Sequence, residues 1–287
     1  MKFGSVINYN FLWSNEGHGL LSTLLKRSGR KQFGVLESPA VLSNIYDGEV
    51  SYKVFLCGRS GIGKTSIVSK LTGKDTQDAN SETSGIQVSV VYWPVQIIET
   101  KKVVLFKVSF WDTGEHMLNM YNHILPSCLE DIDGILYTFS LADKSSWDDL
   151  SKLITRIDAE EDILKVCVGT RLDLPSKRVV TSKMIEDFMH VWKYPVLKIN
   201  NTRPANISNH VDLLKETAPF LNRLCELLWY RDQVKAGLVQ NTLADFCFTD
   251  ENMYLHERSG STGSRESVGS KGSQKNILHR RPLQVCL

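Results

Sequence analysis

The sequence lacks the features that mark membrane-spanning, secreted and nucleic-acid-binding proteins. No apolar run reaches about 18 residues, the length that spans a bilayer, and the first residues show no charged segment followed by an apolar one. A large charge of one sign is also missing, because the formal net charge is +2 over 287 residues. We therefore expect a cytoplasmic protein without a nucleic-acid partner.

Cysteine is sparse, and no two cysteines have the C-x-x-C spacing of a metal site. The six are widely separated: Cys57, Cys128, Cys167, Cys225, Cys247 and Cys286. We expect free thiols in a reducing compartment, not disulfides or metal ligands.

The composition is otherwise that of a globular protein, with 42% hydrophobic and 23% charged residues. We expect residues 1–48 to form an arm that packs on the core, and residues 49–240 to form a single α/β domain. Residues 241–287 form an extension. From about residue 257 this extension is rich in Ser, Gly, Lys and Arg with few apolar groups, so we expect it to be disordered.

The strongest motif is residues 58–65, GRSGIGKT, which fit the phosphate-loop pattern G-x-x-x-x-G-K-[ST]. Glycines let the backbone N–H groups of such a loop approach phosphate oxygens closely. Lys64 would reach the terminal phosphates, and the Thr65 hydroxyl would ligate Mg2+. The predicted phosphate-binding residues are Gly58, Ser60, Gly61, Ile62, Gly63, Lys64, Thr65 and Ser66.

Strand and helix patterns alternate around this loop, beginning with a strand at 52–57 and a helix at 65–71. Further strands are predicted at 87–98, 102–111, 134–139, 166–169 and 196–199. Further helices are predicted at 19–26, 117–128, 145–157 (capped by Ser145), 181–192 and in a long segment with Pro219 in its first turns. This order predicts a mostly parallel central sheet flanked by helices on both faces, with the ligand at the carboxyl ends of the strands.

Three later motifs follow at 83–86 (TSGI), 111–114 (WDTG) and 170–173 (TRLD). An acidic residue ending the strand after a phosphate-loop unit is expected to coordinate Mg2+, here Asp112 through a water molecule. In this order the motifs resemble switch I, switch II and the guanine-reading motif of Ras-type small GTPases. The resemblance implies a P-loop small-GTPase domain that binds GTP or GDP with Mg2+, with Thr83 contacting the metal and the γ-phosphate.

The resemblance also assigns the base site. Asp173 would accept hydrogen bonds from guanine N1 and the exocyclic amine, which adenine does not offer in that geometry. Arg171 stands beside Thr170 where the family usually has a Lys, and its guanidinium would stack on the base. In the segment NNT at 200–202, the backbone N–H of Asn201 would meet guanine O6.

The segment after Asp112 departs from the family pattern D-x-x-G-Q, since it reads DTGEH and is one residue short. In one register Gly114 keeps the phosphate contact and Glu115 takes the place of the water-orienting Gln. In the other register His116 takes that place, so Glu115 and His116 are the candidate catalytic residues. A carboxylate beside the γ-phosphate would be repelled and cannot donate a hydrogen bond as an amide does. We therefore expect slow intrinsic GTP hydrolysis.

Four sequence segments resemble one narrower group within the Ras-type small GTPases. They are FGVLE at 33–37, TSGIQ at 83–87, FWDTGE at 110–115 and WYRDQVKAGL at 229–238. Over roughly residues 1–240 the chain is similar to the Rem- and Rab-like small GTPases that act as ciliogenesis and planar polarity effectors. That resemblance implies assembly with the polarity proteins Inturned and Fuzzy at the basal body, in the cytoskeleton. It also implies delivery of cargo and intraflagellar-transport components to the cilium, and a part in exocytosis.

No lipid anchor is predicted. The sequence ends in QVCL, so Cys286 fits neither C-a-a-X nor paired-cysteine prenylation, and Met1-Lys2 does not fit N-myristoylation. We expect membrane placement through partner proteins.

Two functions stay open at this point. In the first, GTP and Mg2+ order the segments around Thr83 and Gly114, and a partner reads the resulting surface. In the second, the chain is a pseudo-GTPase scaffold in which nucleotide is structural. The missing Gln favours the scaffold, whereas the intact Lys64, Thr65 and Thr83 favour the switch. An ATP-dependent kinase is disfavoured by Asp173 and by the lack of an Arg-rich lid segment.

Overall fold

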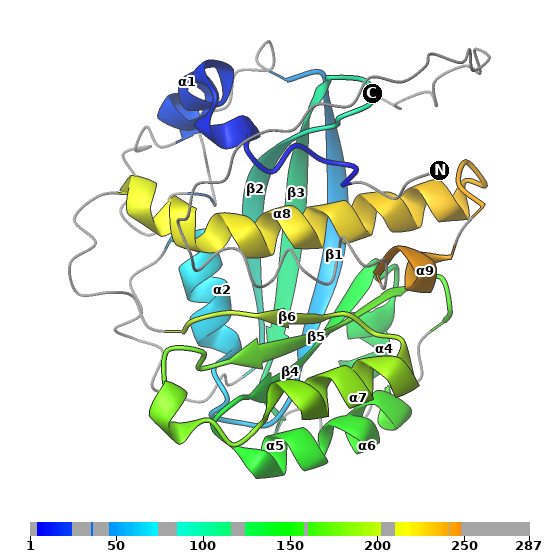
Figure 1. The fold of residues 1–287 in the computed structure, drawn as a ribbon. Helices are drawn as coiled ribbons and strands as arrows, with labels where there is room; N and C mark the ends of the chain where they lie inside the picture. Colours follow the sequence, from blue (N-terminus) through cyan, green and yellow to red (C-terminus); the bar gives the residue numbers. More distant parts are fainter. Residues whose placement is uncertain are drawn as a thin grey trace, which may run out of the picture.

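The computed structural model describes residues 5–24, 36, 46–73, 85–115, 124–157, 160–201, 210–240 and 242–247. A six-stranded sheet with the order β2-β3-β1-β4-β5-β6 forms its centre (Figure 1). The strands are β1 (Gly48–Cys57), β2 (Ile86–Gln96), β3 (Val103–Thr113), β4 (Gly134–Ser140), β5 (Leu164–Thr170) and β6 (Val196–Lys198). Only β2 and β3 pair antiparallel among these strands, which confirms the mostly parallel sheet.

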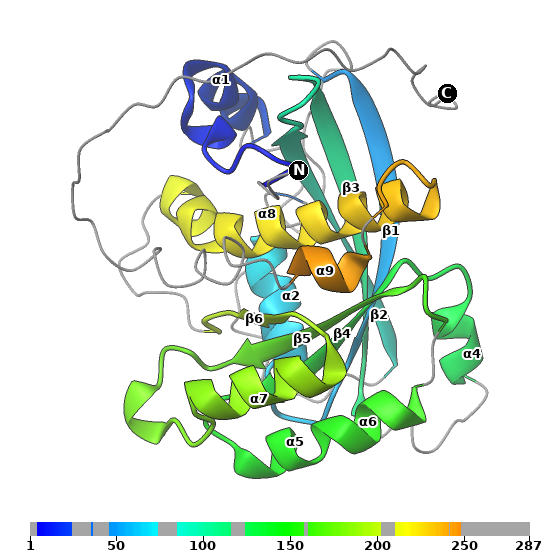
Figure 2. The same cartoon turned by 45° about the vertical axis from the view of Figure 1, so that its right-hand side comes forward.

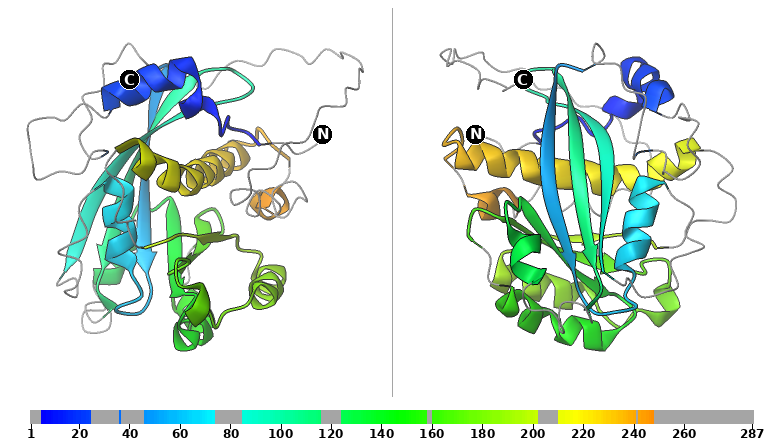
Figure 3. Two further views of the ribbon diagram at one scale, coloured as in Figure 1. Left: turned by 60° about the vertical axis from the view of Figure 1, so that its left-hand side comes forward. Right: turned by 180° about the vertical axis from the view of Figure 1, so that it is seen from behind.

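Helices cover both faces of this sheet, as predicted. They are α1 (Asn15–Leu24), α2 (Lys64–Thr72), α4 (Ile124–Leu129), α5 (Lys144–Asp148), α6 (Leu150–Arg156), α7 (Ser182–Trp192), α8 (His210–Lys235) and α9 (Leu243–Cys247). Successive residues of a strand point to opposite faces. In β1, Val54 and Leu56 join the apolar cluster under α2 and α8, whereas Phe55 and Cys57 join the cluster under α4, α6 and α7. The two groups of helices lie on opposite sides of the sheet in Figures 2 and 3.

The amino-terminal arm lies along the sheet edge. Ile7 forms an antiparallel bridge with Ile97 just beyond β2, and the Tyr92 N–H donates to the Leu36 carbonyl at 3.0 Å. The helix of the arm, α1, begins before the predicted start at residue 19. The Ser14 hydroxyl accepts a 3.1 Å hydrogen bond from the Gly17 N–H and so caps this earlier start.

The predicted helix at 145–157 is two helices, and its predicted cap is wrong. Asp143 precedes α5, and its carboxylate accepts from both the backbone N–H (3.0 Å) and the hydroxyl (2.7 Å) of Ser145. This hydrogen bonding lowers the pKa of Asp143. Asp and Ser are comparable cap residues, and the upstream Asp143 takes the role because Ser145 itself serves as its donor. The helical segment is then interrupted at Asp149, which lies between α5 and α6.

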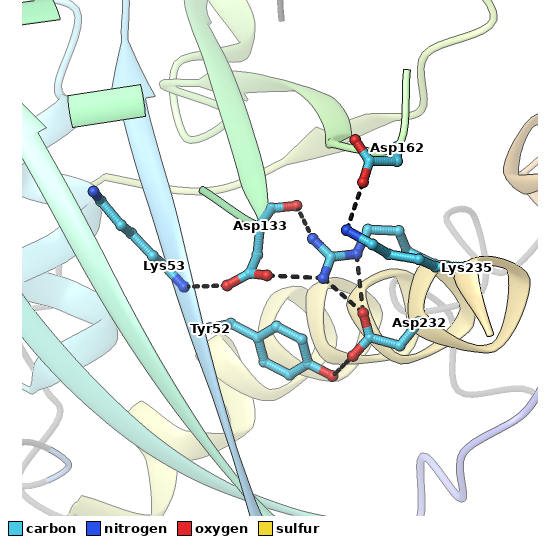
Figure 4. Close-up of polar contacts among 7 residues, drawn as sticks. Tyr52, Lys53, Asp133, Asp162, Asp232 and Lys235 are labelled. Atoms are coloured by element: carbon cyan, nitrogen blue, oxygen red, sulfur yellow. Dashed lines mark hydrogen bonds and ion pairs between the residues drawn. The ribbon is translucent and has the colours of Figure 1, made fainter. Parts of the chain in front are cut away.

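The long helix α8 crosses one face of the sheet (Figure 1) and begins at His210, so Pro219 lies inside the helix and not in its first turns. Arg231 ties its carboxyl half to the sheet through Asp133, which Figure 4 shows beside Tyr52 and Asp232. The guanidinium donates to the Asp133 carbonyl (2.6 Å) and carboxylate (2.8 Å), and Asp232 accepts from the Tyr52 hydroxyl at 2.7 Å. Asp133 also accepts from the backbone N–H of Lys53 in β1 at 2.7 Å. This network lies at the opposite end of β4 from its carboxyl end.

Several predictions from the sequence lie outside the described residues. They are the helix over 117–123, the disorder from about residue 257, and the roles of Thr83 and His116. In the part of the chain that is described, no helix is both long and apolar enough to cross a membrane. The five cysteines in that part are buried free thiols.

Candidate functional site

The carboxyl ends of four strands meet at one edge of the sheet. The strands β1, β3, β4 and β5 run parallel and end there at Cys57, Thr113, Ser140 and Thr170. Residues 58–63 connect β1 to α2 at this edge, and the predicted base-reading segment, residues 170–173, begins at the last residue of β5. The fold therefore brings together segments that lie more than a hundred residues apart in the sequence.

The loop between β1 and α2 requires glycine at two positions. Gly58 has φ +146°, and a Cβ there would lie 2.5 Å from the Thr138 carbonyl oxygen. Gly63 has φ +101°, and a Cβ there would overlap the Asn201 side-chain amide. Both conformations are ones that side-chain-bearing residues rarely adopt. The loop can thus wrap tightly in front of α2, which is the strand, loop and helix context that the motif requires.

Lys64 lies across this loop. Its side chain is buried, and Nζ donates 2.8 Å hydrogen bonds to the carbonyls of Gly58 and Arg59. Lys64 also begins α2, whose first N–H groups and dipole favour an anion in front of the helix. The remaining predicted phosphate-binding residues, Ser60, Gly61, Ile62 and Ser66, lie on the same loop and first turn. This arrangement can cradle a chain of phosphates.

The two described residues that are predicted to hold a metal lie in contact. The Thr65 hydroxyl on α2 donates to Asp112 Oδ2 at 2.5 Å, and Asp112, the residue before the last of β3, has 1% of its surface exposed. In the described ranges no cluster of three His, Cys, Asp or Glu side chains is present that could hold a metal alone. A hydroxyl and a carboxylate fit Mg2+, which is typically held by few protein ligands together with water and phosphate oxygens. The residues present therefore fit a magnesium–nucleotide complex.

The base-reading loop is tied directly to the phosphate loop. The Thr170 hydroxyl donates to the Ile62 carbonyl at 2.7 Å, and Arg171 Nη2 donates to the Gly61 carbonyl at 2.5 Å. Arg171 itself has φ +55°. Asp173 lies two residues further along the same loop, half-buried. The guanidinium of Arg171 thus holds the phosphate loop in this structure, a role that the sequence did not suggest.

Asn201 adds a second tie through its side chain. Its Oδ1 accepts from the backbone N–H of Arg171 at 3.1 Å, and its Nδ2 donates to the Gly63 carbonyl at 3.3 Å. The sequence suggested only a backbone contact from Asn201 to the base. Nothing local in the sequence signals this bridge, because Asn201 and Gly63 are 138 positions apart.

Glu115 points back at the phosphate loop. Its Oε2 accepts a 2.8 Å hydrogen bond from the backbone N–H of Ser60. Gly114, just before it, is buried. Glu115 and Arg59 also line a cavity of about 170 Å3 between the loop and α6. Arg59 is held there by Ser145 (2.6 Å) and by Asp149 (3.5 Å).

The nearest cysteine is not a reactive group of this site. Burial raises the pKa of the Cys57 thiol, and the nearby Lys64 acts against that rise without cancelling it. A buried thiol with a raised pKa is a poor nucleophile.

Residues 53–218 match the Ras family. The chain belongs to the Ras family. The matched residues run from β1 into α8 and include the phosphate loop, Asp112 and the base loop. Family membership implies binding of a guanine nucleotide, typically with Mg2+, which agrees with the fit of the site residues.

Relatives extend the similarity beyond the matched domain. The chain is 40% identical to Ciliogenesis and planar polarity effector 2 of Xenopus laevis over 245 residues, covering 83% of this chain and 98% of that protein. It is 35% identical to the Homo sapiens protein of the same name over 244 residues, covering 83% and 95%. The Ras-related protein RabF1 of Dictyostelium discoideum is 30% identical over 161 residues, covering 54% and 78%. These matches confirm the predicted resemblance to Ras-type small GTPases and the narrower resemblance to ciliogenesis and planar polarity effectors.

Proposed function

We propose that this protein is a guanine-nucleotide-binding switch that acts as a ciliogenesis and planar polarity effector. The observation that carries the nucleotide part is the hydrogen-bonded connection between two loops. The side chains of Thr170 and Asn201 join the base-reading segment to Ile62 and Gly63 of the phosphate loop. A site that reads base and phosphates together needs a fixed distance between the two loops, and these bonds supply it.

Each described site residue has a distinct task in this proposal. Lys64 and the N–H groups of the loop hold the phosphates, and Asp173 accepts hydrogen bonds from the guanine edge. Thr65 and Asp112 would hold Mg2+, the latter through water. The bound metal would neutralise charge on the phosphate oxygens. The segments around Thr83 and Gly114 would change order with the state of the nucleotide and so present a partner surface.

Slow intrinsic hydrolysis is part of the proposal. No Gln follows Asp112 in the segment DTGEH, and Glu115 contacts the phosphate loop. Small GTPases with the usual Gln already turn over unaided at only about 10⁻³–10⁻⁴ per second. We expect a rate at or below that range in a single-turnover GTP assay without a partner, and a faster rate would contradict slow hydrolysis.

The cellular part of the proposal rests on the relatives. They cover most of this chain and are named for ciliogenesis and planar polarity. We propose that the protein assembles with Inturned and Fuzzy at the basal body, in the cytoplasm and cytoskeleton, and reaches membranes through these partners. There it would direct cargo and intraflagellar-transport components to the cilium and contribute to exocytosis.

Two measurements test the switch. Nucleotide extracted from the purified protein should contain guanine, and adenine would overturn the assignment. Capture of Inturned and Fuzzy should be stronger with protein loaded with a GTP analogue than with protein loaded with GDP. The matched control is Lys64→Ala protein, which should show no difference between the two nucleotides.

A second candidate function is a pseudo-GTPase scaffold in which the nucleotide is structural. The carboxylate of Glu115 on the Ser60 N–H favours it, because that contact does not resemble a site prepared for attack by water. Equal capture of partners with GDP and with a GTP analogue would favour this function over the switch.

A further inference from the structure

In this structure the phosphate loop already binds a carboxylate from its own chain, that of Glu115. The backbone N–H of Ser60, in the third position of the loop, donates to Glu115 Oε2 at 2.8 Å. Backbone N–H groups of such a loop are the donors that bind phosphate oxygens. We propose that Glu115 is a specificity-determining residue that competes with the terminal phosphate of GTP, so that the free protein prefers GDP. The inference rests on the proposed binding of guanine nucleotides.

The position of Glu115 selects the terminal phosphate and not the inner ones. Asp112 contacts Thr65 at the start of α2, and this pair would hold the metal. A metal held there would neutralise charge on the terminal phosphates of the nucleotide. Glu115 follows Asp112 by three residues and meets the loop at Ser60, four residues before α2 begins. The N–H groups at the start of α2, which would hold the inner phosphates, are outside this contact.

A carboxylate and a phosphate cannot share the same N–H donor. Both are anions that need the same hydrogen-bond geometry, and like charges at close range oppose each other. GDP has no terminal phosphate to displace Glu115, so its binding leaves the contact with Ser60 intact. GTP must move the side chain away, and the binding free energy of GTP is reduced by the loss of that contact.

The structure provides a second place for the displaced side chain. The cavity of about 170 Å3 that Glu115 lines is also lined by Arg59, Lys152 and Arg156. Asp149 lines it too and pairs with Arg59 (3.5 Å) and Lys152 (3.1 Å), so three basic side chains face one other carboxylate there. A carboxylate that leaves Ser60 would therefore meet positive charge within the same cavity. Two alternative positions close together are what a side chain needs to respond to the presence of one phosphate.

The experiment compares affinities for fluorescent GDP and GTPγS in the full chain with Mg2+. The variants are Glu115→Ala and Glu115→Gln, and the control is Glu186→Gln, an exposed residue of α7. We expect the wild type to bind GDP more tightly. Glu115→Ala should bind GTPγS about tenfold more tightly than the wild type, the size expected for one hydrogen bond to a charged group. Its affinity for GDP should change by less than about twofold, and Glu186→Gln should match the wild type.

The ratio of the affinity for GTPγS to the affinity for GDP decides the result. An unchanged ratio in both Glu115 variants, or an equal change for GDP and GTPγS, would overturn the inference and leave the proposed function standing. If the wild type binds neither guanine nucleotide, the proposed function itself fails. Glu115→Asp is the variant to use if the others do not fold. Its shorter side chain should also raise the ratio in favour of GTPγS, and a ratio equal to that of the wild type would overturn the inference.

Discussion

Single side chains set the distance between the phosphate loop and the base loop. Asn201 bridges the backbone of Arg171 and that of Gly63, and Thr170 adds a shorter bond to Ile62. The bridge needs Gly63, because any side chain there would overlap the amide of Asn201. Glycine therefore has two roles at this position, a backbone conformation and the space for a neighbour.

Substitution of Gly63 should separate these two roles. Gly63→Ala is expected to lower the free energy of unfolding by at least about 1–3 kcal/mol, from backbone strain alone, and to weaken nucleotide binding. Adding Asn201→Ala should recover the part of the lost stability that comes from overlap with the amide, but not the part that comes from backbone strain. Chemical denaturation measures the free energy of unfolding of each variant. Gly19→Ala in α1 is the control, since a Cβ there meets nothing within 4 Å. A loss of stability in the control equal to that of Gly63→Ala would contradict the argument.

Asp173 should decide the base. Asp173→Ala removes the acceptor of two hydrogen bonds, each worth about 1.5–3 kcal/mol when one group is charged. We expect guanine nucleotides to bind at least about tenfold more weakly, with little change for adenine nucleotides. Asp187→Ala, at an exposed position of α7, should bind as the wild type does. Equal losses for guanine and adenine in a fluorescence titration would show that Asp173 supports the loop and does not read the base.

At the scale of elements, α8 covers the same face of the sheet as α2 and holds the amino-terminal arm. Glu226, fully buried on α8, accepts hydrogen bonds from the Ser5 hydroxyl (2.6 Å), the Val6 N–H (2.8 Å) and the Tyr9 hydroxyl (2.6 Å). Arg223 on the same helix donates to it at 2.7 Å. One carboxylate therefore holds the start of the arm against α8 and neutralises a buried guanidinium.

Removing that charge should release the arm. Glu226→Gln leaves Arg223 buried without its counter-charge, and breaking a buried pair in this way costs about 3–5 kcal/mol. We expect a loss of that size in the free energy of unfolding, and faster amide hydrogen exchange in residues 5–13. Arg223→Met in the Glu226→Gln background should recover part of the loss. The surface variant Glu186→Gln should change neither measurement, and unchanged exchange in Glu226→Gln would refute the role of the carboxylate.

At the scale of the whole molecule, one sheet separates two apolar clusters, and a polar network lies at the end of the sheet remote from the proposed nucleotide site. Tyr52 of β1 is buried in this network, where Asp232 accepts its hydroxyl hydrogen bond at 2.7 Å. Burial raises the pKa of Tyr52, and the nearby carboxylate of Asp232 raises it further. The folded protein thus holds Tyr52 neutral at a pH where an unfolded tyrosine, with a pKa of 10.0, loses its proton.

This difference gives stability a specific dependence on pH. Because the folded pKa is the higher one, the contribution of Tyr52 is complete below pH 10 and is lost as pH rises above it. The wild type should lose about 1.4 kcal/mol more per pH unit above that point than Tyr52→Phe does. Urea denaturation at several pH values measures the two slopes. Parallel slopes for the two proteins would contradict the raised pKa.

Local signals in the sequence were enough for most of the fold and part of the site. Alternating or continuous apolar runs located all six strands, and GRSGIGKT placed Lys64 and Thr65 correctly at the start of the helix that follows β1. Local rules failed where two local candidates competed, as at Asp143 and Ser145, because both can cap a helix. They also missed the early start of α1 at Asn15, since the Ser14 hydroxyl that caps it was not recognised as a signal.

The sequence by itself determined the family, the order of the strands and helices, and the residue types that phosphate, Mg2+ and guanine require. Those properties depend on neighbours in the chain, on spacing within one loop, or on the periodicity of one element. Only the tertiary structure decided that Arg171 holds Gly61, that Asn201 bridges to Gly63 and that Glu115 lies on Ser60. These contacts join positions 110, 138 and 55 residues apart. They depend on where the parallel strands end relative to one another, which no local pattern encodes.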